Sequence, residues 1–111
     1  MAETYKNARL AITNSEQTLY TNGSGGAGII VSLIITNIDG SADDTVTVKV
    51  RDSSASADTE IASTMTVPAD SRLDVCGDNT KVFLENGDSI KMTGGAASGD
   101  LIALASILEI T

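Results

Sequence analysis

The first residues whose types and spacing suggest a chemical site are the glycines of GSGGAG, at positions 23–28. Gly23, Gly25 and Gly28 match the G-x-G-x-x-G spacing of dinucleotide-binding loops, in which glycines let the backbone approach a pyrophosphate. Such a loop must open a helix whose N-terminal amides hold the phosphates. Here Gly28 leads into Ile29 and Ile30, the start of a β-branched run typical of a buried strand. We therefore interpret the segment as a glycine-rich turn between two strands.

Two acidic loops carry the oxygen ligands that calcium prefers. Neither loop has the alternating acids and closing glutamate of an EF-hand, and Asp and Asn are also the residues that tight turns require. We therefore expect no metal ion in either loop, although a calcium site in them remains an alternative. The residues are Asn37, Asp39, Asp43 and Asp44 in the first loop, and Asp78 and Asn79 in the second.

Catalytic groups are scarce in this sequence. It contains no histidine, which excludes His-based triads and His metal ligands, and no base is placed to activate a serine or threonine. The lone Cys76 has no basic neighbour closer than Arg72 or Lys81, and we expect it to pack as a small apolar residue. We expect no catalytic residue, no cofactor-binding residue and no cofactor, so the protein is not predicted to be an enzyme.

The elements that position these residues follow a period of two rather than 3.6. In TVTVKV, for example, Val46, Val48 and Val50 are expected to face a core, and in SIKMT the inward residues are Ile90 and Met92. The same logic predicts strands at 8–13, 17–21, 29–36, 45–50, 59–67, 72–75, 81–85 and 89–93, while the segment 101–110 is ambiguous.

Turn residues separate these segments, and Pro68 is expected to end the strand before it. Eight or nine short strands at this spacing predict an all-β fold without substantial helix, an antiparallel sandwich that is jelly-roll-like, with a barrel as the alternative. We expect residues 1–111 to form one domain. Residues 1–6 are either part of a strand or an extended N-terminal arm.

Two predicted strands are apolar on both faces. Strict alternation puts Ile29, Val31, Leu33 and Ile35 on one face of IIVSLII, with Ile30 and Ile34 on the other. In the last segment, Leu101, Ala103, Ala105 and Ile107 share a face that ends in Glu109, and the opposite face carries Ile102, Leu104, Leu108 and Ile110. Because a two-sheet sandwich covers one face of each strand, we expect a neighbouring subunit, or a loop, to cover the other.

The formal charge of −8 argues against a nucleic-acid partner, since the seven Lys and Arg residues are scattered. No apolar run is long enough to span a bilayer, so no membrane partner is expected. An acidic surface favours solubility and avoids nonspecific contact with DNA or anionic membranes.

The order of segments along the chain resembles a family of small β-sandwich structural proteins of tailed bacteriophages, mainly marine ones. The resemblance covers YKNARLAIT, TLYT, IIVSLIITNIDG, TVTVKVRDSSAS, VPADSRLDV, LENGDSIKMT and GDLIALASILEIT. The chain departs from the family at NGSGGAG, where such proteins often have a shorter turn that contains proline. We expect contacts peculiar to this protein at this loop, and we expect alanine at Gly25 and Gly26 to leave folding cooperative.

The resemblance implies a virion component without catalytic residues, first of all a capsid decoration (cement) protein. Such proteins are made in the host cytoplasm, bind the major capsid protein on the outer surface of the head, and are often homo-oligomers, chiefly trimers. Two alternatives remain at this point. One is a tail or head–tail connector component, and the other is a calcium-dependent module that binds host glycans.

Overall fold

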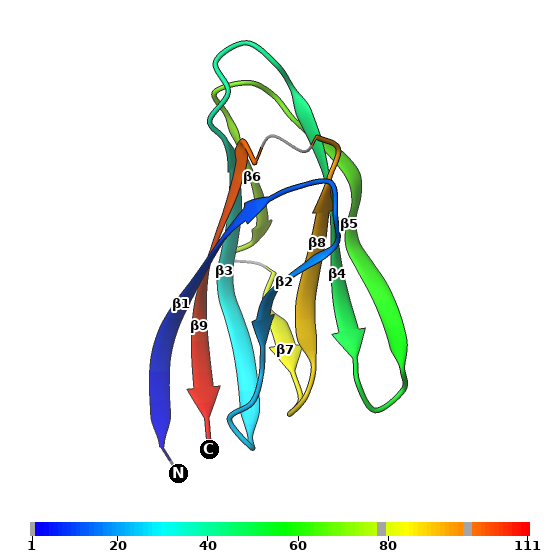
Figure 1. Cartoon of the computed structure of the whole chain (residues 1–111). Helices are drawn as coiled ribbons and strands as arrows, with labels where there is room; N and C mark the ends of the chain where they lie inside the picture. The colour runs from blue at the N-terminus through cyan, green and yellow to red at the C-terminus, as the bar shows by residue number, and fades with distance from the viewer. Residues whose placement is uncertain (1, 78–79, 97–98) are drawn as a thin grey trace.

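The computed structural model describes residues 2–77, 80–96 and 99–111 (Figure 1). These residues form nine strands, and none of them forms a helix long and apolar enough to cross a membrane. The strands are β1 (Glu3–Ile12), β2 (Gln17–Thr21), β3 (Ala27–Asn37), β4 (Asp44–Asp52), β5 (Ala57–Val67), β6 (Arg72–Cys76), β7 (Val82–Leu84), β8 (Ser89–Gly94) and β9 (Leu101–Ile110).

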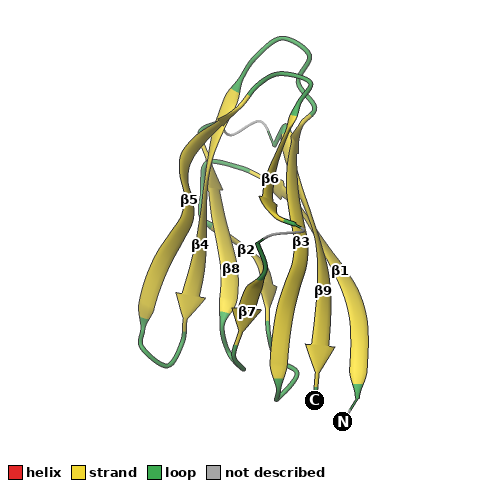
Figure 2. Cartoon of the chain, turned by 180° about the vertical axis from the view of Figure 1, so that it is seen from behind, coloured by secondary structure: helices red, strands yellow, loops and turns green. Residues whose placement is uncertain are grey.

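The strands build two antiparallel sheets that face each other, as the views from the front and from behind show (Figure 1, Figure 2). The five-stranded sheet has the order β1-β9-β3-β6, with β7 also pairing with β3. The four-stranded sheet has the order β2-β8-β4-β5. Neighbours that are distant in sequence, such as β1 beside β9, are typical of double-sheet jelly rolls. The prediction of an antiparallel, jelly-roll-like sandwich is confirmed, and every predicted strand segment, the ambiguous last one included, overlaps an observed strand.

The core lies between the sheets and is made of aliphatic side chains. Val46 and Val48 on β4 lie on the inward face of their sheet beside Ile90 and Met92 of the neighbouring strand β8, with Val48 paired with Met92. All four are buried, as the alternation predicts. Burying each such side chain contributes on the order of 1.5–3 kcal/mol. On the other sheet, the buried residues of β9 are Leu101, Ala103, Ala105, Ile107 and Glu109, which the alternation had grouped on one face.

The predicted faces of β3 are wrong in part, because the strand contains a β-bulge. Its register with β9 shifts between Ile30 and Ser32, so the alternation restarts after the bulge. Ile30, Leu33 and Ile35 are therefore buried together, whereas strict alternation separates Ile30 from the other two. A bulge inserts one extra residue opposite a single partner residue, and the period of two cannot reveal it.

The N-terminal segment lies in a strand over its described residues from Glu3 onward. Glu3 pairs with Ile110 and Ile12 pairs with Leu101, so β1 follows β9 along its full length. Beyond the strand ends, the amide of Ala2 donates to the carbonyl of Thr111 at 2.8 Å, and the two ends of the chain lie side by side (Figure 1). β1 thus begins five residues before the predicted start at residue 8.

Candidate functional site

The outward face of the five-stranded sheet, which we call the outer face, is largely apolar. One row of cross-strand partners runs from Phe83 in β7 through Ile29 in β3 and Leu108 in β9 to Tyr5 in β1. Tyr5 is 77% exposed and Phe83 is 62% exposed, so no described segment lies over these rings. Exposed aromatic side chains beside aliphatic ones are typical of surfaces that bind another protein.

A second row on the outer face combines apolar and charged residues. Asp74 in β6 pairs with Ile34 in β3, which pairs with Leu104 in β9, which pairs with Arg9 in β1. Leu104 is 43% exposed in the middle of this row. At its β6 end, Arg72 Nε lies 3.3 Å from Asp74 Oδ1 in an exposed ion pair. Opposite charges therefore mark the two edges of an apolar centre.

The outward face of the four-stranded sheet has a different character. Lys49 of β4 pairs there with Lys91 of β8, and the neighbouring pair is Thr47 with Thr93. Lys49 Nζ lies 3.0 Å from Glu16 Oε2. The central strands of this face are solvated as in an ordinary sandwich surface, although Ile61 and Met65 are exposed on the edge strand β5. Among the described residues, the uncovered apolar surface across central strands belongs to the outer face of the other sheet.

The acidic loop after β3 uses its side chains to build turns. Asn37 donates from Nδ2 to the carbonyls of Ala42 and Val67, both at 3.0 Å, and accepts the amide of Asp39 at 2.9 Å. Asp39 accepts the amides of Ser41 and Ala42, and these backbone hydrogen bonds hold its pKa below the ordinary value. Asp43 accepts the amide of Ala69 and Asp44 that of Thr45. These four residues and Asp100 line a pocket of about 50 Å³, but the arrangement is explained by turn geometry.

The second predicted acidic cluster, Asp78 with Asn79, lies outside the described residues. Within the described residues, Asp52, Glu85 and Asp88 bring carboxylate oxygens within 4.8 Å of one another. Sequence reasoning missed this group because its members come from two separate turns. Asp52 accepts amides of its own turn and Asp88 accepts the amides of Ser53 and Glu85, so these two also act as turn acceptors.

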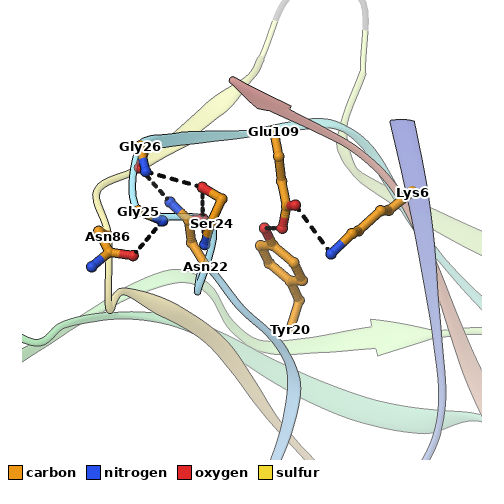
Figure 3. Close-up of polar contacts among 8 residues, drawn as sticks. All are labelled: Lys6, Tyr20, Asn22, Ser24, Gly25, Gly26, Asn86 and Glu109. Atoms are coloured by element: carbon orange, nitrogen blue, oxygen red, sulfur yellow. Dashed lines mark hydrogen bonds and ion pairs between the residues drawn. The ribbon is translucent and has the colours of Figure 1, made fainter. Parts of the chain in front are cut away.

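A buried carboxylate joins the two sheets near the C-terminus. Glu109 is only 6% exposed on the inward face of β9, and the Tyr20 hydroxyl from β2 donates to its Oε2 (Figure 3). Lys6 Nζ lies 3.0 Å from Glu109 Oε1. The hydrogen bond from Tyr20, and then the one from Lys6, lower the pKa of Glu109, while burial and Glu109 raise the pKa of Tyr20. The signal in the sequence was a carboxylate at the end of an apolar face, because a buried carboxylate requires a partner.

This contact predicts a loss of stability at both ends of the pH range. The lowered pKa of Glu109 gives stabilisation that is present above about pH 4.3, the ordinary value, and is lost as the pH falls through the folded-state pKa. The raised pKa of Tyr20 gives stabilisation that is full below about pH 10 and is lost as the pH rises further. Tyr20→Phe should lower the free energy of unfolding at pH 7 by about 1–2 kcal/mol. Urea titrations at a series of pH values should also show a weaker loss of this free energy at both low and high pH. Parallel pH profiles for the two proteins would contradict this account.

The remaining predicted features lie where the sequence suggested. Cys76 is buried at the end of β6, and burial raises the pKa of its thiol, as befits a small apolar core residue. Gly23 and Gly25 lie in the turn between β2 and β3, and Gly28 is already part of β3. A strand, not a helix, follows the G-x-G-x-x-G match, so the loop lacks the helix N-terminus that a dinucleotide needs.

Comparison with known proteins relates the chain to others through its fold. No protein-family model matches the sequence, and no curated protein matches it. A capsid structure of Helicobacter pylori bacteriophage KHP30 contains a similar chain: TM-score 0.58, 11% identity, 97% of this chain and 86% of that chain covered. A structure of the pili that form Bacillus endospore appendages also contains a similar chain, with a TM-score of 0.57 at 13% identity. The match covers 96% of this chain and 84% of that chain.

A third similar structure is the Drosophila NLP core, described in terms of pentamer formation and histone binding. It gives a TM-score of 0.57 at 13% identity and covers 99% of this chain and all of that chain. At such identities the likeness shows the shared β-sandwich fold. Function has to be argued from the surfaces of this chain.

Proposed function

We propose that this protein is a non-enzymatic structural component of a bacteriophage virion, a capsid decoration protein that binds the outside of the head and stabilises it. The observation that carries the proposal is the contrast between the two sheets. One outward face is polar, while the other exposes Tyr5, Phe83 and Leu104 along an apolar sheet. Such a surface favours protein partners, here other copies of the chain and the major capsid protein.

The charge of the chain is compatible with this location. A formal charge of −8 is unfavourable beside packaged DNA and suits a protein on the outside of a capsid. The similar folds come from a phage capsid, a pilus and a pentamer, and all three names describe assemblies of repeated subunits. Turn geometry accounts for the carboxylates of Asp39 and Asp43, which gives little support to a calcium-dependent glycan module.

The test is to rebind the purified protein to phage heads stripped of their decoration proteins. We expect saturable binding and a higher temperature of DNA release. Leu104→Asp, on the outer face, should weaken binding whether this face contacts the capsid directly or joins copies of the chain that bind the capsid together, whereas Thr47→Asp, on the outward face of the other sheet, should leave it unchanged. Absence of binding to stripped heads would overturn the proposal. A few dozen copies per virion, rather than hundreds, would indicate a tail or connector component instead.

A further inference from the structure

We propose that a second copy of this chain docks on the outer face about a two-fold axis that runs parallel to the strands, between β3 and β9. In this pair, Phe83 of one copy faces Tyr5 of the other, and Asp74 faces Arg9. The inference rests on the proposed function only in treating the chain as a subunit of an assembly, and it names the partner and the contact.

The strand order makes the outer face self-complementary. Across the sheet the order is β6 and β7 on one edge, then β3, β9 and β1. A two-fold axis between β3 and β9 places each of these strands over the other, and places β1 over β6 and β7. Each cross-strand row of one copy then contacts the same row of the other copy in the opposite order. This is the condition for an isologous contact, in which both copies use the same surface.

The first row supplies matched apolar partners. From β7 to β1 the residues of this row are Phe83, Ile29, Leu108 and Tyr5. The two-fold axis therefore places the Phe83 ring against the partner's Tyr5 ring, and Ile29 against the partner's Leu108. The two rings are among the most exposed large apolar side chains of the described residues. Aromatic pairs contribute beyond the area that they bury, which makes this row the expected centre of binding energy.

The second row fixes the direction of the axis through charge. Its order is Asp74, Ile34, Leu104 and Arg9, so an axis parallel to the strands brings Asp74 to Arg9 at both ends of the row. An axis perpendicular to the strands that runs along this row would instead set Asp74 against Asp74 and Arg9 against Arg9. Opposed like charges disfavour that arrangement, and complementary ones select the parallel axis.

The charge balance of the face also favours a copy of the same chain. The charged side chains that the register places on the outer face are Glu3, Arg9, Arg72 and Asp74, two of each sign. The whole chain has a formal charge of −8. Two copies that meet through this face therefore avoid bringing their acidic surfaces together.

The hollows and projecting side chains of the outer face are also complementary in this pair. A hollow of about 360 Å³ beside β6 is lined by Ser32, Ile34 and Asp74 among others, and the exposed Leu104 of the partner faces its Ile34. A second hollow, of about 380 Å³, is lined by Tyr5, Asn7 and Ser106 among others, and it lies toward the partner's Phe83. The side chains that project thus face recesses.

The size of the face is adequate for a stable contact. Four strands at a spacing of about 4.8 Å and about ten residues at roughly 3.4 Å each give a projected area of roughly 650 Å². Side-chain relief increases this area toward the roughly 800 Å² per partner of standard protein interfaces.

Charge reversal tests the pairing directly. We expect sedimentation velocity to show a dimer of the native chain, and Arg9→Glu or Asp74→Lys alone to raise its dissociation constant about tenfold or more. The double variant Arg9→Glu/Asp74→Lys should return to within about threefold of the native value, and an equimolar mixture of the two single variants should form mixed dimers. Arg51→Glu, the same charge change on the other sheet, is the matched control and should leave the dissociation constant nearly unchanged. Circular dichroism checks that each variant is folded.

Several outcomes would overturn the pair. They are a native chain that stays monomeric at about 100 μM, a trimer without a dimer, or single variants that dimerise as tightly as the native chain. Head binding separates this failure from failure of the proposed function. A monomer that still binds stripped heads, and loses that binding with Leu104→Asp, would assign the outer face to the capsid instead. A dimer that does not bind heads would leave the pair standing and overturn the decoration role.

Discussion

Replacing Asn22 with aspartate is expected to destabilise the protein by about 3 kcal/mol or more. Asn22 is fully buried directly after β2. Its Nδ2 donates to the carbonyl of Gly26 at 3.0 Å (Figure 3) and to the carbonyl of Leu84, also at 3.0 Å. Its Oδ1 accepts the amide and the hydroxyl of Ser24. An aspartate at this position can still accept the hydrogen bonds from Ser24. It cannot donate to the two carbonyl oxygens, and it places a negative charge beside them.

Urea unfolding of Asn22→Asp at pH 7 and at pH 5 measures this effect. Burial beside carbonyl oxygens raises the pKa of the introduced carboxyl group, so the defect should shrink as the pH falls and the group takes up a proton. Asn86→Asp is the matched control, because Asn86 is exposed and its Oδ1 accepts the amide of Gly25, a role that a carboxylate also fills. Equal losses in the two variants would show that the buried amide is not what holds the loop.

Replacing Gly26 with alanine is expected to lower the free energy of unfolding by about 2–3 kcal/mol. A β-carbon at Gly26 would overlap the carbonyl oxygen of Ile110 and lie 3.1 Å from the Cα of Thr111. Both are backbone atoms, so relief requires the start of β3 to move away from the end of β9. The sequence led us to expect cooperative folding with alanine at this position, and the close approach to β9 adds that the change should nevertheless lower stability.

Gly23→Ala provides the comparison within the same loop. A β-carbon at Gly23 meets nothing within 4 Å, and Gly23 does not have a positive φ. We expect no loss of stability, and a gain of up to about 1 kcal/mol, because alanine restricts the unfolded chain. Thermal unfolding of both variants should rank Gly26→Ala well below Gly23→Ala, and the opposite order would refute the steric account.

These two predictions change the meaning of the glycine-rich loop. The sequence suggested a flexible turn that offers contacts to a partner. In the structure, the Asn22 side chain donates a hydrogen bond across the turn to the carbonyl of Gly26, and Gly25 adopts φ +86°. The Gly26 backbone lies against the carbonyl oxygen of Ile110 at the end of β9. The loop is thus tied to the sandwich by specific backbone requirements, and the outer face is the better candidate for intermolecular contact.

Asn37 repeats the arrangement at the other end of β3. Like Asn22, it is buried and donates to two carbonyls, one within its own loop and one from another segment. The sequence singled out Asn37 as a potential calcium ligand, yet its Nδ2 and Oδ1 are both used to close the turn. The sequence around an asparagine that precedes a turn does not tell a calcium ligand from a residue that closes the turn. The carbonyl groups that surround the side chain in the structure make that distinction.

Strand positions could be predicted because the physics that sets them is local. Alternation in TVTVKV and SIKMT places Val48 and Met92 on the buried face of their strands, and turn residues separate one apolar run from the next. The end of β5 at Val67, just before Pro68, follows from the missing amide of proline. The apolar second face of β9 could also be predicted, because Ile102, Leu104, Leu108 and Ile110 all fall on alternate positions of the strand.

The composition of the outer face could not be predicted in the same way. Its rows bring Phe83 of β7 beside Ile29 of β3 and set Tyr5 of β1 beside Leu108 of β9. Those neighbours depend on which strands pair and in which register. The bulge near Val31 shifts that register by one residue, and no period in the sequence marks it.

The sequence by itself determined that this chain is a β-sandwich of aliphatic strands, that it lacks histidine-based chemistry, and that two strands carry more apolar surface than a sandwich hides. These properties depend on residue type and on a spacing of two, which act within a few residues. The tertiary structure decided which apolar residues share a face, how Glu109 meets Tyr20 across the two sheets, and how Asp74 and Arg9 come to mark opposite edges of one row. Contacts between distant segments decide these features, because pairing and register place residues side by side that the sequence keeps far apart.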